Sequence, residues 1–519
     1  MAVGETPRQI GLMSSSVQYC EGRLGDASLY TLLNRKGEEL FPDEAFDDVF
    51  SDVGRYSIPP RVVATVMVLQ RAEGLSDRDA VDRFSYDLRW KYAAGGLDYD
   101  YPGFRHTVLV SMRARLRKSE RPNRIFEATL AMCKEAGLVG RKRIMDSTAL
   151  YDAVATQDTV TLIRMAIRGL LREAGSELGC ALQDTLQRDD DYKAAGKPAC
   201  EWDDKEARVA LVDALSKDAY AALDCLEGRA LPPKVNEAMA LLATVVGQDI
   251  EGTPEEGFTV IRGVAKDRVL STVDPEARHG HKTKSRSFDG YKGHLSIDAD
   301  SEIITALDVT AGNVGDGEGA EKLLEEAFSQ VLVEGSSPEE PVEVYGDASY
   351  GTADIVEKLE SAGITVNVKV QEAASPKGCF GKKDFDINLG DNTIRCPQGH
   401  LVVIQRFEDG GGRAAFKSYC GNCPLKSQCT KAKNGRTIRI HAKEEILLRN
   451  RMRQRCPNWK ANYRKTRPKV ERKFSHTMRH RHGGRRARVR GRIRVRHDFS
   501  LLCAAANLKR YAVLMATAA

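Results

Sequence analysis

Three acidic residues that lie far apart along the chain have neighbours that favour a shared metal site. Asp146 follows the strand-like run KRIM, Asp347 follows the strand-like run VEVYG, and Glu471 lies near the start of a helical pattern in TRPKVERKF. Carboxylate oxygens bind hard divalent cations, and two such cations can hold the attacking and leaving oxygens of an in-line displacement at phosphorus. Because the carboxyl ends of strands line a crevice in an open α/β sheet, we expect Asp146 and Asp347 to face one crevice.

Each acid has a simpler explanation when it is considered alone. An aspartate at a strand end is more often a turn or cap residue, and Glu471 has partners for an i,i+4 ion pair on a helix. Asp152 and Asp354 are further acids nearby, but Asp152 lies beyond the strand end and Asp354 falls within a helical pattern. The metal-site hypothesis therefore rests on the combination of the three residues.

Arginine and lysine are concentrated in one segment around Glu471. Residues 451–500 contain 19 Lys or Arg against only Glu471 and Asp498, which is a local charge of +17. Since the whole chain carries +6, the remaining residues carry −11. Such an asymmetry indicates a nucleic-acid-binding face on an otherwise acidic protein. The alternative is a solvated basic segment, which the apolar residues within it disfavour.

Length and composition set the class of protein. The 519 residues are enough for about three or four domains. The longest apolar run, Val62–Leu69, is too short to span a bilayer, and the first residues lack the pattern of a signal peptide. We therefore expect a cytoplasmic protein with no membrane partner. In that compartment the 12 cysteines favour thiols or metal ligands over disulfides.

Residues 57–90 have the pattern of two short helices joined by a glycine turn. Pro59 and Pro60 suit a first helical turn, Gly74 interrupts the pattern, and Ser76 with Asp79 forms the capping box of a second helix. Several arginines lie close by, so this unit is compatible with helix-turn-helix DNA binding. A plain helical hairpin that packs or dimerises fits the pattern equally well.

From residue 143 onward the pattern predicts an α/β sheet. A strand with Asp146 comes first, then a long helical stretch over 159–248, then β-prone runs within 258–311. A helix, a strand ending at Asp347, a helix and a strand over 365–370 follow, and the helix with Glu471 is last. Three strands before the first helix of the core predict a mixed sheet. This order is that of the ribonuclease H-like fold.

The fold class we expect is therefore α/β, with an all-α N-terminal domain over residues 1–135. The ribonuclease H-like core would consist of residues 140–157, 258–372 and 441–519. Two insertions would interrupt it, a helical one over 158–257 and a Cys-rich, zinc-ribbon-like one over 373–440.

The second insertion contains cysteines with metal-ligand spacing. Cys420 and Cys423 form a C-x2-C pair, Cys429 follows six residues later, and Cys396 or His400 would complete a tetrahedral set. A C-x2-C turn presents two thiolates to one ion, so we favour a structural zinc site. Reduced cysteines in a small loop-rich unit are the alternative, because the spacing is not that of a standard zinc finger.

The chain carries a series of motifs in a specific order. They are LFPDEAFDDVF and SIPPRVVATVMVLQ near the N-terminus, then MDSTAL, FDGYKGHLSID, VTAGNVGDGEGA, YGDASYG and TRPKVERKF. From about residue 40 to 515, except for the helical insertion, this series resembles the DDE transposases of bacterial insertion sequences that have an InsH-like N-terminal domain. The resemblance implies that Asp146, Asp347 and Glu471 form a triad that binds two Mg²⁺ or Mn²⁺ ions.

By the same resemblance the enzyme would cleave double-stranded DNA at the element ends and join the freed 3′-hydroxyl to target DNA. Pairing two DNA ends implies a homodimer or a larger assembly. The basic segment would hold DNA through Arg467, Arg472, Lys473 and Arg479. The chain departs from the related signature in that three residues separate Tyr463 from Arg467 and Met478 occupies the usual lysine position, so Lys473 or Arg479 would replace that lysine.

Two other functions are compatible with these residues. One is a ribonuclease H-like nuclease that cleaves without strand transfer. The other is a zinc-containing DNA-binding protein without catalytic activity.

Overall fold

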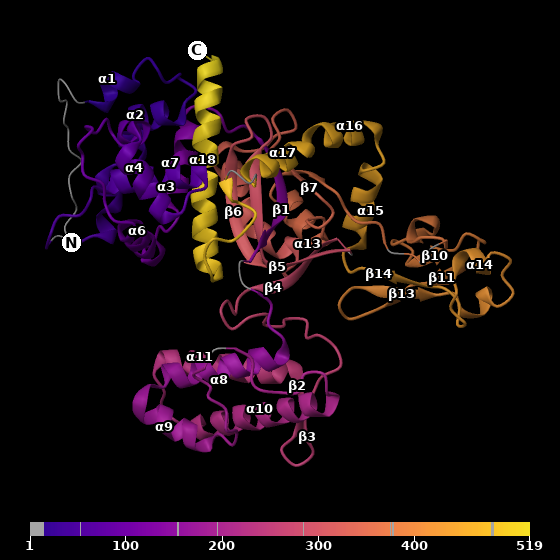
Figure 1. Cartoon of the computed structure of the whole chain (residues 1–519). Coiled ribbons are helices and arrows are strands. Elements are labelled where there is room, and N and C mark those ends of the chain that lie inside the picture. Colours follow the sequence, from indigo (N-terminus) through magenta and orange to yellow (C-terminus); the bar gives the residue numbers. More distant parts are fainter. Residues whose placement is uncertain are drawn as a thin grey trace.

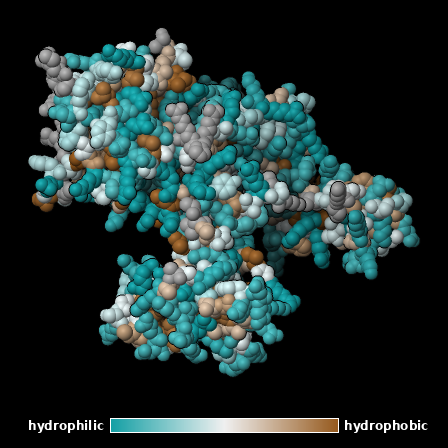
Figure 2. Space-filling model, viewed as in Figure 1, coloured by the Kyte–Doolittle hydropathy of each residue, from teal (hydrophilic) through white to brown (hydrophobic). Residues whose placement is uncertain are grey.

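The computed structural model describes residues 15–51, 53–152, 155–194, 196–283, 285–373, 375, 378–478 and 482–518. It is a mixed α/β protein. In Figure 1 the N-terminal helices and the main sheet form one body, from which a helical insertion and a Cys-rich insertion project as two lobes. Figure 2 shows that hydrophilic residues dominate the visible face of all these parts.

The N-terminal part is all-helical, as expected. Its helices are α1 (Ser16–Cys20), α2 (Leu29–Leu40), α3 (Pro60–Glu73), α4 (Asp77–Tyr86), α5 (Leu88–Ala93), α6 (Thr107–Lys118) and α7 (Arg124–Glu135). The predicted helix pair within residues 57–90 is confirmed.

Local sequence explains how this pair is built. Gly74 ends α3 with a left-handed φ of 74°, and the Ser76–Asp79 capping box begins α4. Helix α3 is buried along nearly its whole length and packs against the C-terminal helix α18 (Arg492–Ala518). It is therefore a core helix, and only α4 keeps an exposed face.

The main sheet contains both parallel and antiparallel strands. The strands are β1 (Lys142–Tyr151), β4 (Arg278–Thr283), β5 (Arg286–Asp298), β6 (Ile304–Ala311), β7 (Glu343–Gly346) and β8 (Thr365–Val368). Their order is β4-β5-β1-β7-β8, and β6 also pairs with β5. Strand β5 is antiparallel to β1, β4 and β6, whereas β1, β7 and β8 are mutually parallel.

Alternating side chains of β1 pack on the two faces of the sheet. Ile144 lies in the hydrophobic core that also contains the N-terminal helices and α18. Met145 lies in the opposite core, which is formed with α12 (Ala320–Glu334) and α13 (Ala353–Ser361). This period-2 pattern buries both faces of the strand that carries Asp146.

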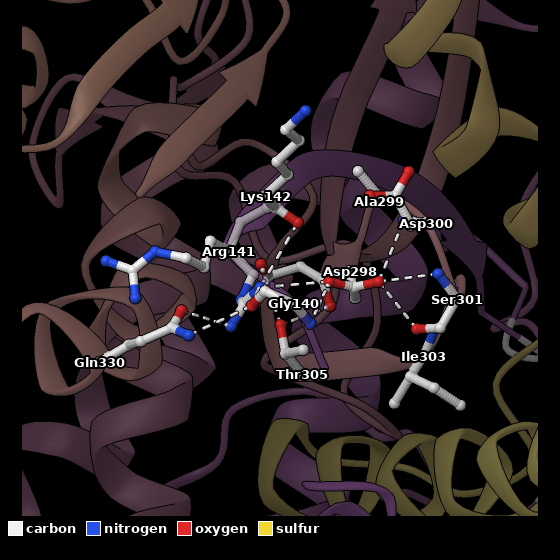
Figure 3. A network of polar contacts seen from close by, with 12 residues as sticks. Gly140, Arg141, Lys142, Asp298, Ala299, Asp300, Ser301, Ile303, Thr305 and Gln330 are labelled. Atoms are coloured by element: carbon white, nitrogen blue, oxygen red, sulfur yellow. Dashed lines mark hydrogen bonds and ion pairs between the residues drawn. The ribbon is translucent and has the colours of Figure 1, made fainter. Parts of the chain in front are cut away.

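A buried polar network holds the beginning of β1 in place. Arg143 is 1% exposed, and its guanidinium donates to Glu326 of α12 at 2.6 Å and contacts Asp298 at the end of β5 at 3.4 Å. Asp298 also accepts hydrogen bonds from the backbone N–H groups of Gly140 and Ser301, as Figure 3 shows. The network ties β1, β5 and α12 together three residues before Asp146.

Helix α18 stands between the N-terminal helices and the sheet (Figure 1) and contacts α3, α7 and β6. Its length and composition would allow it to cross a membrane, but 61% of the relevant window is buried inside the protein. In this fold it is the helix that joins two parts of one core.

The helical insertion contains α8 (Thr159–Glu173), α9 (Gly175–Thr185), α10 (Lys205–Leu226) and α11 (Pro233–Asp249), which form their own core. A hairpin of β2 (Ile250–Thr253) and β3 (Gly257–Val260) follows. The run that begins at Phe258, which we expected in the main sheet, pairs with β2 instead. Phe258 packs in the core of the insertion and stacks on Tyr220.

The Cys-rich insertion is a small, loop-rich β unit. Strands β9 (Asp386–Asn388), β10 (Thr393–Arg395) and β11 (Leu401–Val403) form one sheet, and β12 (Gln405–Arg406), β13 (Gly412–Ala415) and β14 (Thr437–Ile440) form another. The chain then returns to the main body through α15 (Glu444–Arg453), α16 (Pro457–Thr466) and α17 (Pro468–Thr477).

Candidate active site

The site lies where two parallel strands separate. Strands β1 and β7 pair from Lys142 opposite Glu343 to Ile144 opposite Tyr345. Continuing this register by two residues brings Asp146 level with Asp347. There β7 has already ended, while β1 continues to Tyr151 along β5 alone. We had expected Asp146 to end its strand. Instead, β1 continues beyond Asp146, which lies at the point where β1 no longer pairs with β7.

Glu471 reaches the same place from helix α17, which packs against β1. Pro468 begins this helix, Glu471 lies in its first turn, and Val470 and Phe474 are buried beneath it. The helix ends at Thr477. Asp146, Asp347 and Glu471 all line one cleft with a volume of about 1230 Å³.

Arg467 connects two of the three acids. One guanidinium nitrogen lies 3.0 Å from Oδ2 of Asp146, and another lies 3.4 Å from Oε1 of Glu471. Arg467 is only 8% exposed, whereas the Glu471 side chain is 67% exposed. Burial alone lowers the pKa of Arg467, but the charges of Asp146 and its other neighbours raise it overall. Arg467 therefore remains a cation and supplies positive charge between these acids.

Asp146 is held in an environment that disfavours its ionised form. The net effect raises the pKa of this carboxyl to about 6: burial and the charge of Asp347 raise the pKa, whereas Arg467 and the backbone N–H of Ser147 lower it. Arg467 thus offsets the cost of ionising the buried Asp146 carboxyl only in part. A second cation in the cleft would offset the rest.

Tyr463 positions the end of β7. Its hydroxyl donates a hydrogen bond to the carbonyl of Gly346 at 3.0 Å, directly before Asp347. Its ring stacks on Trp459, with centroids 4.8 Å apart, and Lys369 lies 5.0 Å from its centre. Burial raises the pKa of Tyr463 to about 12, so the hydroxyl stays protonated and can donate. The tyrosine therefore orients the chain at the site and does not face the cleft.

Sequence reasoning assigned no role to Lys292, Asp316 or Ser147, which also line the cleft. The Lys292 ammonium lies 2.9 Å from Asp316, and the Ser147 hydroxyl donates to Asp316 at 2.9 Å. Lys292 and Asp316 belong to the motifs FDGYKGHLSID and VTAGNVGDGEGA. The signal that could have found them is the occurrence of charged residues within these two motifs.

The cleft suits a hard divalent cation, because the carboxylates of Asp146, Asp347 and Glu471 can supply oxygen ligands. The carboxylate of Asp146 is also buried, and its neighbours neutralise its negative charge only in part. Over the described residues, no three His, Cys, Asp or Glu side chains are arranged as a ready metal site. The position of Arg467 between Asp146 and Glu471 accounts for this at the cleft.

The four residues expected to contact DNA have different environments. Arg467 is buried in the ion pairs described above, and Arg472 is 61% exposed and pairs with Glu302 at 2.6 Å. Lys473 is 5% exposed and lies beneath α17, so its predicted contact with DNA does not agree with its position. The reason is that α17 turns this side toward α18, a contact that the local sequence does not reveal. Arg479 lies outside the described residues.

The four predicted zinc ligands come together in the Cys-rich unit. Cys396, Cys420, Cys423 and Cys429 line one small cavity, together with His400. Burial raises the pKa of the Cys429 thiol, and the charges of the other three cysteines raise it as well. The backbone N–H of Arg436 points at the Cys420 sulfur at 3.3 Å. These cysteines are free thiols, and the donor types fit zinc, although their arrangement is not a ready metal site.

Comparison with protein families gives two matches, one in the N-terminal part of the chain and one in the C-terminal part. Residues 27–115 match the family described as Transposase domain (DUF772), and residues 395–512 match the family described as Transposase DDE domain. No curated protein and no solved structure matches the chain. The first match covers helices α2 to α5 and most of α6, and the second covers most of the Cys-rich unit, Glu471 and most of α18. Together the two matches support a DDE transposase of the bacterial insertion-sequence type.

Proposed function

We propose that this transposase cleaves double-stranded DNA at the ends of an insertion sequence and joins the freed ends to target DNA. The observation that carries the proposal is the convergence of Asp146, Asp347 and Glu471 on one cleft where β1 and β7 separate. Two acids from adjacent parallel strands and one from a helix form a compact oxygen donor set. Asp146 and Glu471 are 325 positions apart in the sequence. Separate turn or cap roles would not explain why such distant acids meet at one cleft.

The strand order supports a ribonuclease H-like core. An antiparallel group of β1, β5 and β6 comes first in the chain, and the parallel strands β7 and β8 continue from β1 on the other side. Helices α12 and α13 follow β6 and β7, which is the order that the sequence predicted for this fold. In the chain, the helical unit lies between β1 and β4, and the Cys-rich unit lies between β8 and α15.

In this proposal Asp146, Asp347 and Glu471 hold Mg²⁺ or Mn²⁺. When bound, these ions supply activation of the attacking oxygen and stabilisation of the leaving 3′-oxygen. Water would attack the phosphodiester, and the bond from phosphorus to the 3′-oxygen would break. The 3′-hydroxyl so released would then attack a target phosphodiester and displace the 3′-oxygen of the target strand, which leaves as a 3′-hydroxyl. Lys292 lies within the cleft and is placed to attract the phosphate, and Tyr463 keeps the backbone before Asp347 in position.

The remaining partners follow from the same proposal. The basic segment over 451–500 would bind the DNA backbone, with Arg472 as an exposed contact. We propose that the protein acts in the cytoplasm, as a homodimer or a larger assembly on two DNA ends. Cys396, Cys420, Cys423 and Cys429 would hold a structural zinc ion that stabilises the Cys-rich unit and takes no part in the chemistry.

A joining assay tests the proposed function. The substrate is a duplex that carries the inverted repeats expected to bracket this reading frame, and a pre-cut copy is offered with a target plasmid and Mg²⁺. We expect the pre-cut end to join the plasmid. Cleavage of the intact duplex without joining would indicate the nuclease instead, and binding without either reaction would indicate a non-catalytic DNA-binding protein.

The Asp347→Asn variant shows whether the proposed triad performs the reaction. We expect both reactions to fall by at least about 1000-fold while DNA affinity stays within about twofold. Asp354→Asn is the matched control, because Asp354 lines the same cleft but pairs with Lys443 on its rim. Equal losses in both variants would contradict the assignment of Asp347.

Metal analysis of the purified protein tests the zinc proposal. We expect about one zinc per chain, lost in Cys420→Ser and retained in Cys180→Ser, whose thiol is exposed on the helical insertion. A zinc-free native protein would contradict a structural site, and it would leave the assignment of the acidic cleft intact.

A further inference from the structure

A second cavity lies behind helix α17, on the side away from the acidic cleft. It has a volume of about 250 Å³ and is lined by residues of α17, α18, the end of α3 and the turn between β5 and β6. Its apolar wall comes from α18 and includes Leu502, Ala505 and Val513. This wall makes the cavity suitable for the body of a small organic molecule.

The polar part of this cavity is strongly basic. Lys473, Lys509 and Arg510 line it, together with His476 and His482. The acid in its lining is Glu302, whose carboxylate is already hydrogen-bonded to Arg472 at 2.6 Å. The cavity therefore carries an excess of positive charge.

Lys473 is the residue that points to a ligand. It is 95% buried, and no hydrogen bond or ion pair of its ammonium group occurs within the described part of the chain. By contrast, Lys509 donates to the carbonyl of Ala72 at 2.8 Å, and Arg510 donates to the carbonyl of Ser301 at 2.6 Å. A buried ammonium without a partner is costly, and an anion in the cavity would supply one.

We propose that this cavity binds a small organic anion whose carboxylate or phosphate head pairs with Lys473 and whose apolar body packs against α18. The head would sit among the basic residues, and the body would cover Leu502 and Ala505. Because the cavity shares α17 with the acidic cleft, an occupant would contact the helix that carries Glu471. The site is independent of the proposed DNA chemistry, since none of its lining residues belongs to the acidic cleft.

Isothermal titration calorimetry of the full chain, with benzoate and phenyl phosphate as probes, tests this site. We expect a Kd of about 1 mM or tighter for at least one probe, and at least tenfold weaker binding of the neutral analogue benzyl alcohol. Inorganic phosphate should bind more weakly than phenyl phosphate because it lacks the apolar body. Equal affinity for the neutral analogue, or no binding of either anion, would overturn the proposal.

Two variants locate the binding. Lys473→Met should abolish benzoate binding and should raise the melting temperature of the ligand-free protein, because it replaces an unpaired buried cation by an apolar chain of similar length. Lys465→Met, which removes an exposed lysine of α16, should change neither property. Unchanged benzoate affinity in Lys473→Met would place the anion elsewhere.

A second substitution keeps the test valid where Lys473→Met does not fold. Ala506→Leu retains Lys473 but fills part of the cavity wall on α18. We expect it to weaken benzoate binding at least tenfold and to affect inorganic phosphate less. The same affinity for benzoate as in the unmodified protein would overturn the proposal.

Discussion

The two sides of helix α17 contain opposite charge imbalances. On one side Asp146 is a buried acid that has a partial partner, Arg467, at 3.0 Å. On the other side Lys473 is a buried base without any partner within the described residues. The acidic side opens into a large cleft, whereas the basic side encloses a cavity of about a fifth of its volume.

This difference shows how one helix serves two environments. The acid of the cleft, Asp146, is paired with Arg467, which lies directly before α17. Lys473 has no such partner within the described residues, and in our proposal a bound anion supplies one. The partial neutralisation of Asp146 by Arg467 is compatible with the proposed binding of a metal ion and substrate in the cleft. The unpaired charge of Lys473 is compatible with the proposed binding of one anion in the cavity.

The largest expected effect comes from removing the acid on the cleft side of α17. Glu471→Gln should reduce Mg²⁺-dependent DNA cleavage by about 100-fold or more, because one of three carboxylate ligands is lost. Glu445→Gln, an exposed acid of α15, is the matched control and should cleave normally. Full cleavage by Glu471→Gln would remove the distinction between the two sides of the helix.

A second prediction concerns the internal partner of the acid. Arg467→Met should lower the free energy of unfolding by about 3 kcal/mol in the absence of metal, because it leaves Asp146 buried without its cation. Mg²⁺ should restore much of this loss, as a shift in the denaturant midpoint would show. Arg464→Met, on the exposed side of α16, should have little effect with or without metal. A loss that Mg²⁺ does not reverse would mean that Arg467 serves packing alone.

The pH dependence gives a third test, with two opposite signs. Because the pKa of Asp146 is raised to about 6 from 3.8, the folded state binds the proton more tightly than the unfolded state does. The metal-free protein should therefore gain up to about 3 kcal/mol of stability from this residue as pH falls from 7 to 4. Mg²⁺ affinity should fall over the same range, since the protonated carboxyl binds the ion poorly.

Asp146→Asn separates these effects from the titration of other groups. The difference in stability between this variant and the unmodified protein should depend on pH between about 4 and 6 and should be constant above that range. Denaturant unfolding at several pH values measures it. A difference that is independent of pH would show that Asp146 ionises normally.

The smallest expected effect concerns the tyrosine that supports the site. Tyr463→Phe removes the hydrogen bond to Gly346 and should cost about 1 kcal/mol of stability or less, because the Gly346 carbonyl loses one donor and keeps the backbone N–H of Lys369. Cleavage should fall only a few fold, since Tyr463 does not line the cleft. Tyr86→Phe is the control, because Tyr86 is 82% exposed. A loss of cleavage as large as that of Glu471→Gln would assign Tyr463 a direct role.

The helices and strands of the site could be predicted from the sequence, whereas the way they pack together could not. The strand around Asp146, the strand before Asp347 and the helix with Glu471 each have a local pattern, so all three are present where they were expected. The separation of β1 from β7 depends on pairing between residues about 200 positions apart, and no local pattern contains it. The same applies to the bridge that Arg467 makes from Asp146 to Glu471.

Two further differences have the same physical origin. Lys473 was expected to contact DNA, but contacts between α17 and α18 bury it. The β-prone run at Phe258 indicated a strand of the main sheet, but the nearby segment 250–253 offers a closer pairing partner, and a hairpin forms. In both cases local sequence allows more than one environment for the residue, and a tertiary contact determines which one forms.

The position of α18 has a consequence for how the protein is made. Its apolar residues complete the core of helices α2, α3 and α7, which leave the ribosome several hundred residues earlier. Until residues 492–518 have been synthesised, those helices expose the surface that α18 later covers. The N-terminal helices and the sheet therefore acquire their final packing together, at the end of synthesis, when α18 comes to lie between them.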